Sequence, residues 1–148
     1  MSPQAQFCTF VVDGYHFGIE VELVQEVLRY QEMTRVPLAQ AVVSGLINLR
    51  GQIVTAVNLR RRLALSERTD GALPMNVILR SDDGPVSLLV DEIGEVLSVE
   101  ADLAEPPPET LRGAERELVK HVYKLNGRLL LILDAEKAVR FSAARGTR

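Results

Sequence analysis

An internal repeat limits the folds open to this chain more than any other feature of its sequence. The segment V-E-L-V-Q-E-V-L begins at Val21, and the similar segment V-D-E-I-G-E-V-L begins 69 residues later, at Val90. A second pair follows in the same order: N-L-R-G-Q-I-V-T-A-V-N begins at Asn48, and K-L-N-G-R-L-L-L-I-L-D begins 76 residues later, at Lys124. Chance explains one such match more easily than two in the same order. We therefore expect two similar structural units.

Most of the chain is typical of short strands joined by tight turns. Asp13-Gly14 and Asn126-Gly127 are both signals for a two-residue hairpin, the second for a type I′ turn. From Val21 the apolar residues recur at helical spacing, which predicts a helix over 21–28. Other short helices are expected before Gly45, over 59–65 and after Asp134 as a capping residue. The predicted fold class is all-β with short helices, arranged as two similar five-stranded β-barrels packed together.

The same pattern predicts how the chain is divided. We expect one domain over residues 1–148, with the first barrel at about 20–66. The second barrel is expected from about 7–19 together with 75–141, followed by a flexible tail at 142–148.

The sequence has few residues suited to catalysis or to metal binding. The two histidines, His16 and His121, are predicted at solvent-facing positions of half-buried strands, and Cys8 is the single cysteine. These residues form no ligand set for zinc or an iron–sulfur cluster. The sequence also has no glycine-rich phosphate-binding motif and no nucleophile elbow. We expect no enzyme activity, no catalytic residue, no metal and no cofactor.

Net charge and hydropathy indicate which classes of partner and which cellular compartment to expect. The net charge of −3 provides no basic field for nucleic acid or a membrane surface. The longest apolar run, Leu129–Leu133, is far shorter than the roughly 20 residues that span a bilayer. No charged and apolar leader opens the sequence, and a single cysteine fits a reducing environment. We therefore expect a cytoplasmic protein without membrane insertion.

Equivalent segments of two packed barrels would line a groove between them. Two interpretations of the apolar residues there remain open: they seal the core between the barrels, or they form a slot for a partner helix. The residues are Val21, Val24 and Val27 on one side, and Val90, Ile93 and Val96 on the other.

The motifs around the first hairpin resemble those of the CheW-like adaptor family of bacterial chemosensory arrays. N-L-R-G begins at Asn48, and V-N-L-R follows from Val57. Supporting matches are V-Q-E-V from Val24, R-V-P from Arg35, G-L-I-N-L-R-G from Gly45 and L-L-V-D-E-I from Leu88. The resemblance runs from about Phe7 to Phe141. It departs mildly at Asn58, where the family frequently has Asp, and at the basic run Arg60–Arg62.

The resemblance implies a non-catalytic adaptor built from two SH3-like barrels. Such proteins couple methyl-accepting chemoreceptors to a CheA-type histidine kinase in the cytoplasm, at membrane-attached receptor arrays. The implied partners are the kinase regulatory domain, the cytoplasmic receptor tip and other CheW-like domains in array rings, with no nucleic acid among them.

The resemblance also implies roles for individual residues. Val24, Val27, Ile93 and Val96 would bind the receptor tip in the groove, with Val21 and Cys8 at its margins. Glu26 and Arg50 match a paired acidic and basic position, expected to join a hairpin tip to the helix and to border both partner surfaces. Pro37, Gly45, Arg50, Gly51 and Ile53 are the expected kinase contacts.

Two other functions stay open. The chain could be a CheW-like coupling module of a twitching, gliding or second-messenger system. It could also be a free-standing barrel that binds a ligand or nucleic acid, but aromatic residues make up only 5% of the sequence, too few for base stacking along exposed strands.

Overall fold

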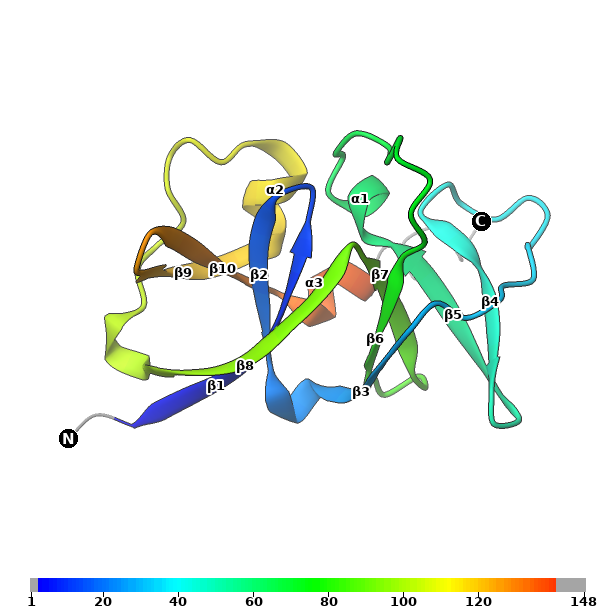
Figure 1. The fold of residues 1–148 in the computed structure, drawn as a ribbon, viewed down its shortest axis with the longest axis horizontal. Coiled ribbons are helices and arrows are strands. Elements are labelled where there is room, and N and C mark those ends of the chain that lie inside the picture. Colours follow the sequence, from blue (N-terminus) through cyan, green and yellow to red (C-terminus); the bar gives the residue numbers. More distant parts are fainter. Residues whose placement is uncertain (1–2, 141–148) are drawn as a thin grey trace.

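The structure is a computed structural model that describes residues 3–140, and its strands form two five-stranded sheets (Figure 1). The sheet of the first barrel has the order β3-β6-β7-β5-β4, and that of the second barrel has the order β8-β1-β2-β10-β9. The first barrel contains β3 (Val24–Leu28), β4 (Val43–Leu49), β5 (Gln52–Asn58), β6 (Met75–Leu79) and β7 (Val86–Val90). The second barrel contains β1 (Gln4–Val12), β2 (Tyr15–Glu20), β8 (Glu92–Glu100), β9 (Val119–Leu125) and β10 (Arg128–Leu133).

Within residues 3–140, five short helices connect or follow these strands. Two are 3-10 helices and three are α-helices, none longer than six residues. They are η1 (Val21–Leu23), α1 (Leu59–Arg62), η2 (Ala101–Leu103), α2 (Gly113–Leu118) and α3 (Ala135–Val139). No helix within residues 3–140 is both long enough and apolar enough to span a membrane.

The two sheets have the same topology. The β1–β2 hairpin occupies in the second barrel the place that the β6–β7 hairpin occupies in the first. The second strand of each hairpin pairs in parallel with the fourth strand in the sheet order, β10 or β5. After each hairpin the chain crosses to the other sheet, through β3 or β8. The predicted pair of similar five-stranded barrels is confirmed. When the two repeat units are taken as β1–β5 and β6–β10, the first hairpin of each unit belongs to the sheet of the other unit.

One predicted barrel boundary is wrong because of this exchange. Residues 75–90 were expected in the second barrel, but β6 and β7 belong to the sheet of the first. β6 pairs with β3, and β7 pairs with both β6 and β5. After β2 the chain leaves the second barrel, and it returns there only after Asp91, where β8 begins. The predicted tail at 142–148 lies outside the described residues.

The helix predicted over 21–28 is largely wrong. Only Val21–Leu23 is helical, and Val24–Leu28 is a strand that pairs with β6. Valine loses side-chain freedom in a helix and packs well on a sheet, so strand pairing overrides the helical spacing. The helix expected before Gly45 is also absent, because β4 already begins at Val43.

The predicted hairpins and capped helices are present. Asn58 Oδ1 accepts a hydrogen bond of 3.1 Å from the backbone N–H of Arg61 at the start of α1. Asp134 Oδ1 accepts one of 3.0 Å from Lys137 at the start of α3. The turn at Asn126-Gly127 differs from type I′, since Gly127 alone has a positive φ, 84°.

Three hydrophobic clusters form the core, and the largest of them draws on both barrels. It includes Phe10 and Phe17 of the second barrel together with Val77, Leu79 and Leu88 of the first. The barrels therefore share one continuous core rather than meeting through a polar interface.

The prediction that His16 faces solvent is wrong. The residue is only 9% exposed, and it lines a pocket together with Pro108 and Leu111. Burial lowers the pKa of His16, and the nearby Arg128 charge lowers it further, so the ring is neutral at pH 7. His121 is half-buried.

Candidate functional site

A β-bulge on β3 brings two valines to one face. Val24 lies opposite Leu79 of β6 and Val27 lies opposite Val77, with a register shift between the two pairs. Residues directly opposite each other on antiparallel strands project to the same face of the sheet. Leu79 and Val77 share a face because they are two residues apart. The bulge therefore places Val24 and Val27 on that face as well.

An equivalent bulge acts on β8. Ile93 lies opposite Phe10 of β1 and Val96 lies opposite Cys8, again with a register shift between the pairs. Phe10 and Cys8 share a face of β1, so Ile93 and Val96 share that face too. In both barrels, residues spaced three apart reach one face through a bulge rather than through a helix.

A hydrogen bond from a side chain of β1 to the backbone of β8 spans the bulge on β8. The Thr9 hydroxyl donates a hydrogen bond of 2.5 Å to the carbonyl oxygen of Glu95. A Cβ at Gly94 would lie 2.5 Å from the same hydroxyl oxygen, so glycine is the residue that fits there.

We call Val24, Val27, Ile93 and Val96 the junction surface. Val24 and Ile93 are partly buried and pack against the core cluster shared by the barrels. Val27 is 42% exposed and Val96 is 57% exposed. The inner pair is therefore anchored in the core, while the outer pair presents apolar surface to solvent.

The two expected margins of this surface are half-buried. Cys8 lies between Val96 of β8 and Ile19 of β2, on the face of the junction surface. Burial raises the pKa of its thiol, which keeps the sulfur protonated and weakly nucleophilic. Val21 begins η1, the short helix that leads from the second barrel into β3.

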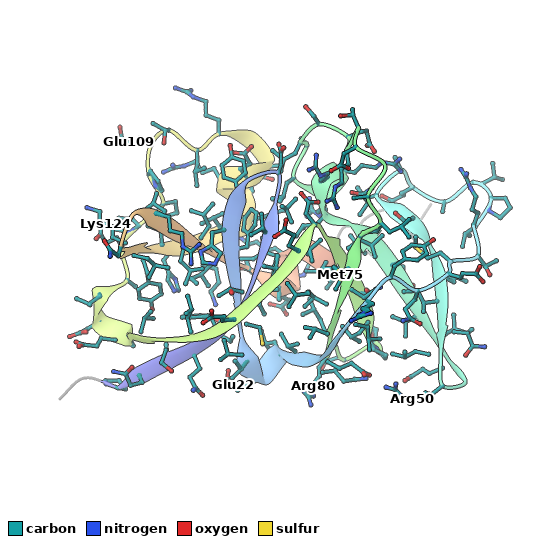
Figure 2. The ribbon with its side chains drawn as sticks, in the orientation of Figure 1. Glu22, Arg50, Met75, Arg80, Glu109 and Lys124 are labelled. Carbon is teal, nitrogen blue, oxygen red and sulfur yellow. The ribbon has the colours of Figure 1, made fainter. Side chains whose placement is uncertain are left out.

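Glu26 and Arg50 are in contact: a guanidinium nitrogen of Arg50 donates a hydrogen bond to the Glu26 carboxylate. Arg50 and Gly51 form the turn between β4 and β5 with φ of 52° and 87°, both positive as in a type I′ turn. The Asn48 side chain accepts a hydrogen bond of 2.9 Å from the Gly51 N–H. The N-L-R-G motif therefore encodes a tight turn with Arg50 at the tip of the hairpin (Figure 2).

The ion pair joins the two edges of one sheet. Glu26 lies on β3 and Arg50 follows β4, and these are the outer strands of the first barrel. Thr34 and Leu46 help to close the same barrel through two backbone hydrogen bonds of 2.8 Å. The expectation that Arg50 contacts a helix is wrong, since Glu26 is on a strand.

The structure separates the expected kinase contacts. Arg50, Gly51 and Ile53 lie together at the β4–β5 tip, and the Ile53 side chain is 59% exposed. Pro37 is exposed but precedes the far end of β4, so it is not brought to this tip. Gly45 is buried, and a Cβ there would lie 2.7 Å from the Thr34 carbonyl oxygen. Close packing therefore accounts for a glycine at this position.

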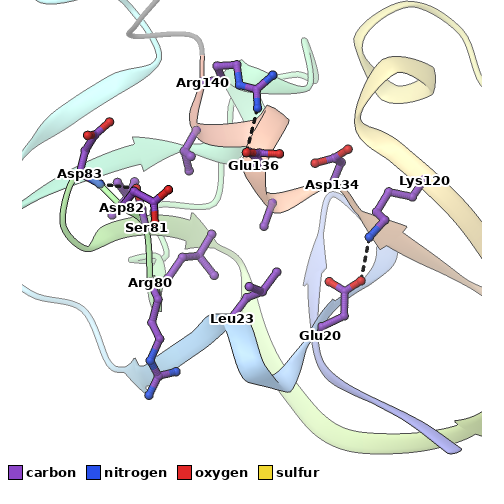
Figure 3. A pocket seen from close by; sticks show the side chains of 14 residues that line it. Glu20, Leu23, Arg80, Ser81, Asp82, Asp83, Lys120, Asp134, Glu136 and Arg140 are labelled. Atoms are coloured by element: carbon purple, nitrogen blue, oxygen red, sulfur yellow. Dashed lines mark hydrogen bonds and ion pairs between the residues drawn. The ribbon is translucent and has the colours of Figure 1, made fainter.

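The structure also has a charged cleft on the α3 side of the barrel junction, which no sequence motif predicted. The cleft has a volume of about 550 Å³, and it is lined by charged side chains together with apolar residues that include Leu23, Leu79 and Val86 (Figure 3). Lys120 pairs with Glu20 at 2.8 Å, and Arg140 pairs with Glu136 at 2.9 Å. Glu20 and Lys120 come from distant segments, whereas Glu136 and Arg140 are four residues apart. None of the four junction residues lines this cleft.

Within residues 3–140, no group of three or more His, Cys, Asp or Glu side chains is arranged to hold a metal ion. The features of the site are thus an apolar surface, an ion-paired hairpin tip and a charged cleft. All three are suited to binding rather than to chemistry.

Comparison with known proteins identifies the family. The sequence model of the CheW-like domain matches residues 6–142. The chain belongs to the CheW-like family. Members of this family are non-enzymatic scaffold proteins, and the chain is accordingly a CheW-type scaffold protein of chemotaxis rather than an enzyme.

Relatives support this assignment along nearly the whole chain. The chain is 31% identical over 138 residues to the chemotaxis protein CheW of Treponema pallidum (strain Nichols), covering 90% of this chain and 81% of that protein. It is 32% identical over 126 residues to CheW of Bacillus subtilis (strain 168), covering 85% and 81%. The crystal structure of the scaffolding protein TtCheW from Thermoanaerobacter tengcongensis has the same fold, with a TM-score of 0.78, 23% identity, and coverage of 90% and 89%.

Proposed function

We propose that this chain couples methyl-accepting chemoreceptors to a CheA-type histidine kinase. Its role is to hold both partners in one assembly, in the cytoplasm beneath membrane-attached receptor arrays. Other CheW-like domains in array rings are further partners. The observation that carries this proposal is the junction surface, where exposed apolar side chains continue outward from the shared core.

The junction surface is the proposed receptor site. An amphipathic helix binds by placing apolar side chains into a matching apolar surface. Val27 and Val96 offer exposed apolar groups, one from each barrel, and Val24 and Ile93 give them a rigid base. A helical receptor tip that lies across the junction would therefore contact both barrels at once.

The β4–β5 tip is the proposed kinase site. Ile53 supplies an exposed apolar side chain, and Arg50 supplies a charged group that Glu26 orients. A binding site needs an apolar anchor and a polar rim, and these residues provide one of each. Arg50 and Ile53 lie on the β4–β5 hairpin, whereas the four residues of the junction surface lie on β3 and β8, so we expect two distinct binding surfaces.

Reconstitution tests the proposal. Autophosphorylation of a cognate CheA-type kinase is measured with receptor signalling fragments, with and without this chain. We expect the chain to raise kinase output only when the receptor fragment is present. Equal output with and without the chain would refute the coupling function.

A further inference from the structure

Within the described residues, the chain crosses between the barrels twice. The first crossing runs from β2 through η1 to β3, and the second runs from β7 to β8 through Asp91 alone. Val24 is the first residue after η1, and Ile93 is the second residue after Asp91. The geometry of each crossing therefore sets the position of one inner residue of the junction surface.

The second crossing is tied to both barrels by Asp91. On the side of the second barrel, its N–H donates to the Val11 carbonyl at 2.9 Å, and its carboxylate accepts from the Asp13 N–H at 2.8 Å. On the side of the first barrel, the carboxylate accepts from Arg60 Nε at 3.2 Å and from Arg60 Nη2 at 2.7 Å. Arg60 belongs to α1, directly after β5. One carboxylate thus connects a helix of one barrel to a hairpin turn of the other.

The geometry of this contact makes it rigid. Two parallel hydrogen bonds from one guanidinium fix both the distance and the angle between the groups. The side chains of Arg60 and Asp91 are 14% and 12% exposed, so water competes weakly for them. Arg60 also donates to the Ser66 carbonyl at 2.8 Å and lies 3.6 Å from the Asp13 carboxylate, which leaves little freedom to its side chain.

The first crossing is also held by an arginine of the first barrel. Arg80, directly after β6, donates to the carbonyl oxygens of Glu22 and Val24 at 3.2 Å and 2.8 Å. At the first crossing only the donor, Arg80, is a side chain, because both acceptors are backbone oxygens. At the second crossing both Arg60 and Asp91 contribute side chains, so substitution can test the contact from either partner.

We propose that Arg60 and Asp91 are a positioning pair: they fix the angle between the barrels and so hold Ile93 and Val96 in register with Val24 and Val27. The pair touches neither partner. This inference rests on the proposed receptor site for its functional consequence, although its structural consequence is independent of any partner.

The experiment measures the distance between the barrels. Spin labels are placed at Gln52→Cys and Asn126→Cys, the exposed tips of the two equivalent hairpins, in a Cys8→Ser background, and the distance distribution is recorded by pulsed electron paramagnetic resonance. The test variants are Asp91→Asn and Arg60→Lys, the second of which keeps the charge but loses the planar fork. The control is Glu67→Gln, which removes the exposed 2.8 Å ion pair to Arg61 on the same helix.

We expect a broadened distance distribution in both test variants and an unchanged one in the control. Affinity for a receptor-tip fragment should fall about tenfold in the test variants, while affinity for the kinase regulatory domain changes less than about twofold. If Asp91→Asn does not fold, Arg60→Lys decides the question.

Narrow distributions in the test variants would overturn the positioning role. Broad distributions with unchanged receptor affinity would also overturn it, since the pair would then set the angle without affecting the surface. If the unsubstituted chain fails to bind the receptor fragment, the proposed function fails, while the distance measurement still decides whether the pair fixes the barrels.

Discussion

Val24 of β3 and Ile93 of β8 hold equivalent places in the two barrels and pack against the same hydrophobic core. Each is followed three residues later by an exposed valine, Val27 or Val96, on the same face of its sheet. A bulge lies between the two residues in both strands. The internal repeat therefore produces a two-sided apolar surface where the barrels meet, with one contribution from each.

The first prediction concerns the exposed ion pair. Arg50→Ala should weaken assembly with the kinase yet lower the free energy of unfolding by no more than about 1 kcal/mol, because partly exposed ion pairs contribute little to stability. Arg50 is 65% exposed and Glu26 is 24% exposed. Kinase binding and thermal unfolding are measured side by side, with Lys124→Ala on the β9–β10 hairpin as the control.

The exchange of charges tests whether the two residues act as a pair. Glu26→Arg combined with Arg50→Glu should recover part of the binding that each single change removes. A sharp drop in the melting temperature of Arg50→Ala would instead show that the pair supports the fold.

The second prediction concerns Gly45. Gly45→Ala should destabilise the chain by about 1–3 kcal/mol, because the added methyl group overpacks a tight site. The new Cβ would lie 2.7 Å from the backbone oxygen of Thr34, which cannot move aside as a flexible side chain would. Chemical denaturation measures the change, with Ser44→Ala on the same strand as the control. A fully stable Gly45→Ala that loses kinase binding would restore Gly45 as a contact residue.

The third prediction is a pH dependence. Burial raises the pKa of Asp91, but hydrogen bonds from Arg60 and from the Asp13 N–H outweigh it and hold the pKa below the usual 3.8. As pH falls, the unfolded chain takes up this proton first, so the stabilisation present at neutral pH is lost below about pH 4. The melting temperature of the unsubstituted chain should therefore exceed that of Asp91→Asn at pH 6, and the difference should shrink towards pH 3. A difference that stays constant across this range would show that Asp91 is not stabilised as a carboxylate.

The repeat made the architecture predictable, but not the path of the chain between the barrels. The segments around Val21 and Val90 match because both follow a hairpin and cross to the other sheet. The place of β6 and β7 in the first barrel depends on their pairing with β3 and β5, which no local pattern reports. The apolar spacing from Val21 predicted a shared face correctly for Val24 and Val27, but it assigned that face to a helix where a bulged strand provides it.

The candidate site was predictable to different degrees. The contact between Glu26 and Arg50 followed from family resemblance, since 24 residues separate them and no local rule joins them. The packing of Gly45 against Thr34 and the burial of His16 beside Pro108 could not be predicted from local sequence, because these neighbours are distant along the chain. Asp91 lay within a recognised motif, yet its partner Arg60 could be identified only from the folded structure.

The most direct test of the central claim compares two exposed apolar residues on different surfaces. Val96 on the junction surface and Ile53 on the β4–β5 tip are 57% and 59% exposed, so an aspartate at either position should leave the fold intact. Each variant is titrated against a receptor-tip fragment and against the kinase regulatory domain, beside a thermal melt. Val96→Asp should lose receptor affinity by about thirtyfold or more and keep kinase affinity, since a charge in an apolar contact is strongly penalised. Ile53→Asp should show the reverse. Equal loss of both partners in either variant, or receptor binding unchanged in Val96→Asp, would contradict the account.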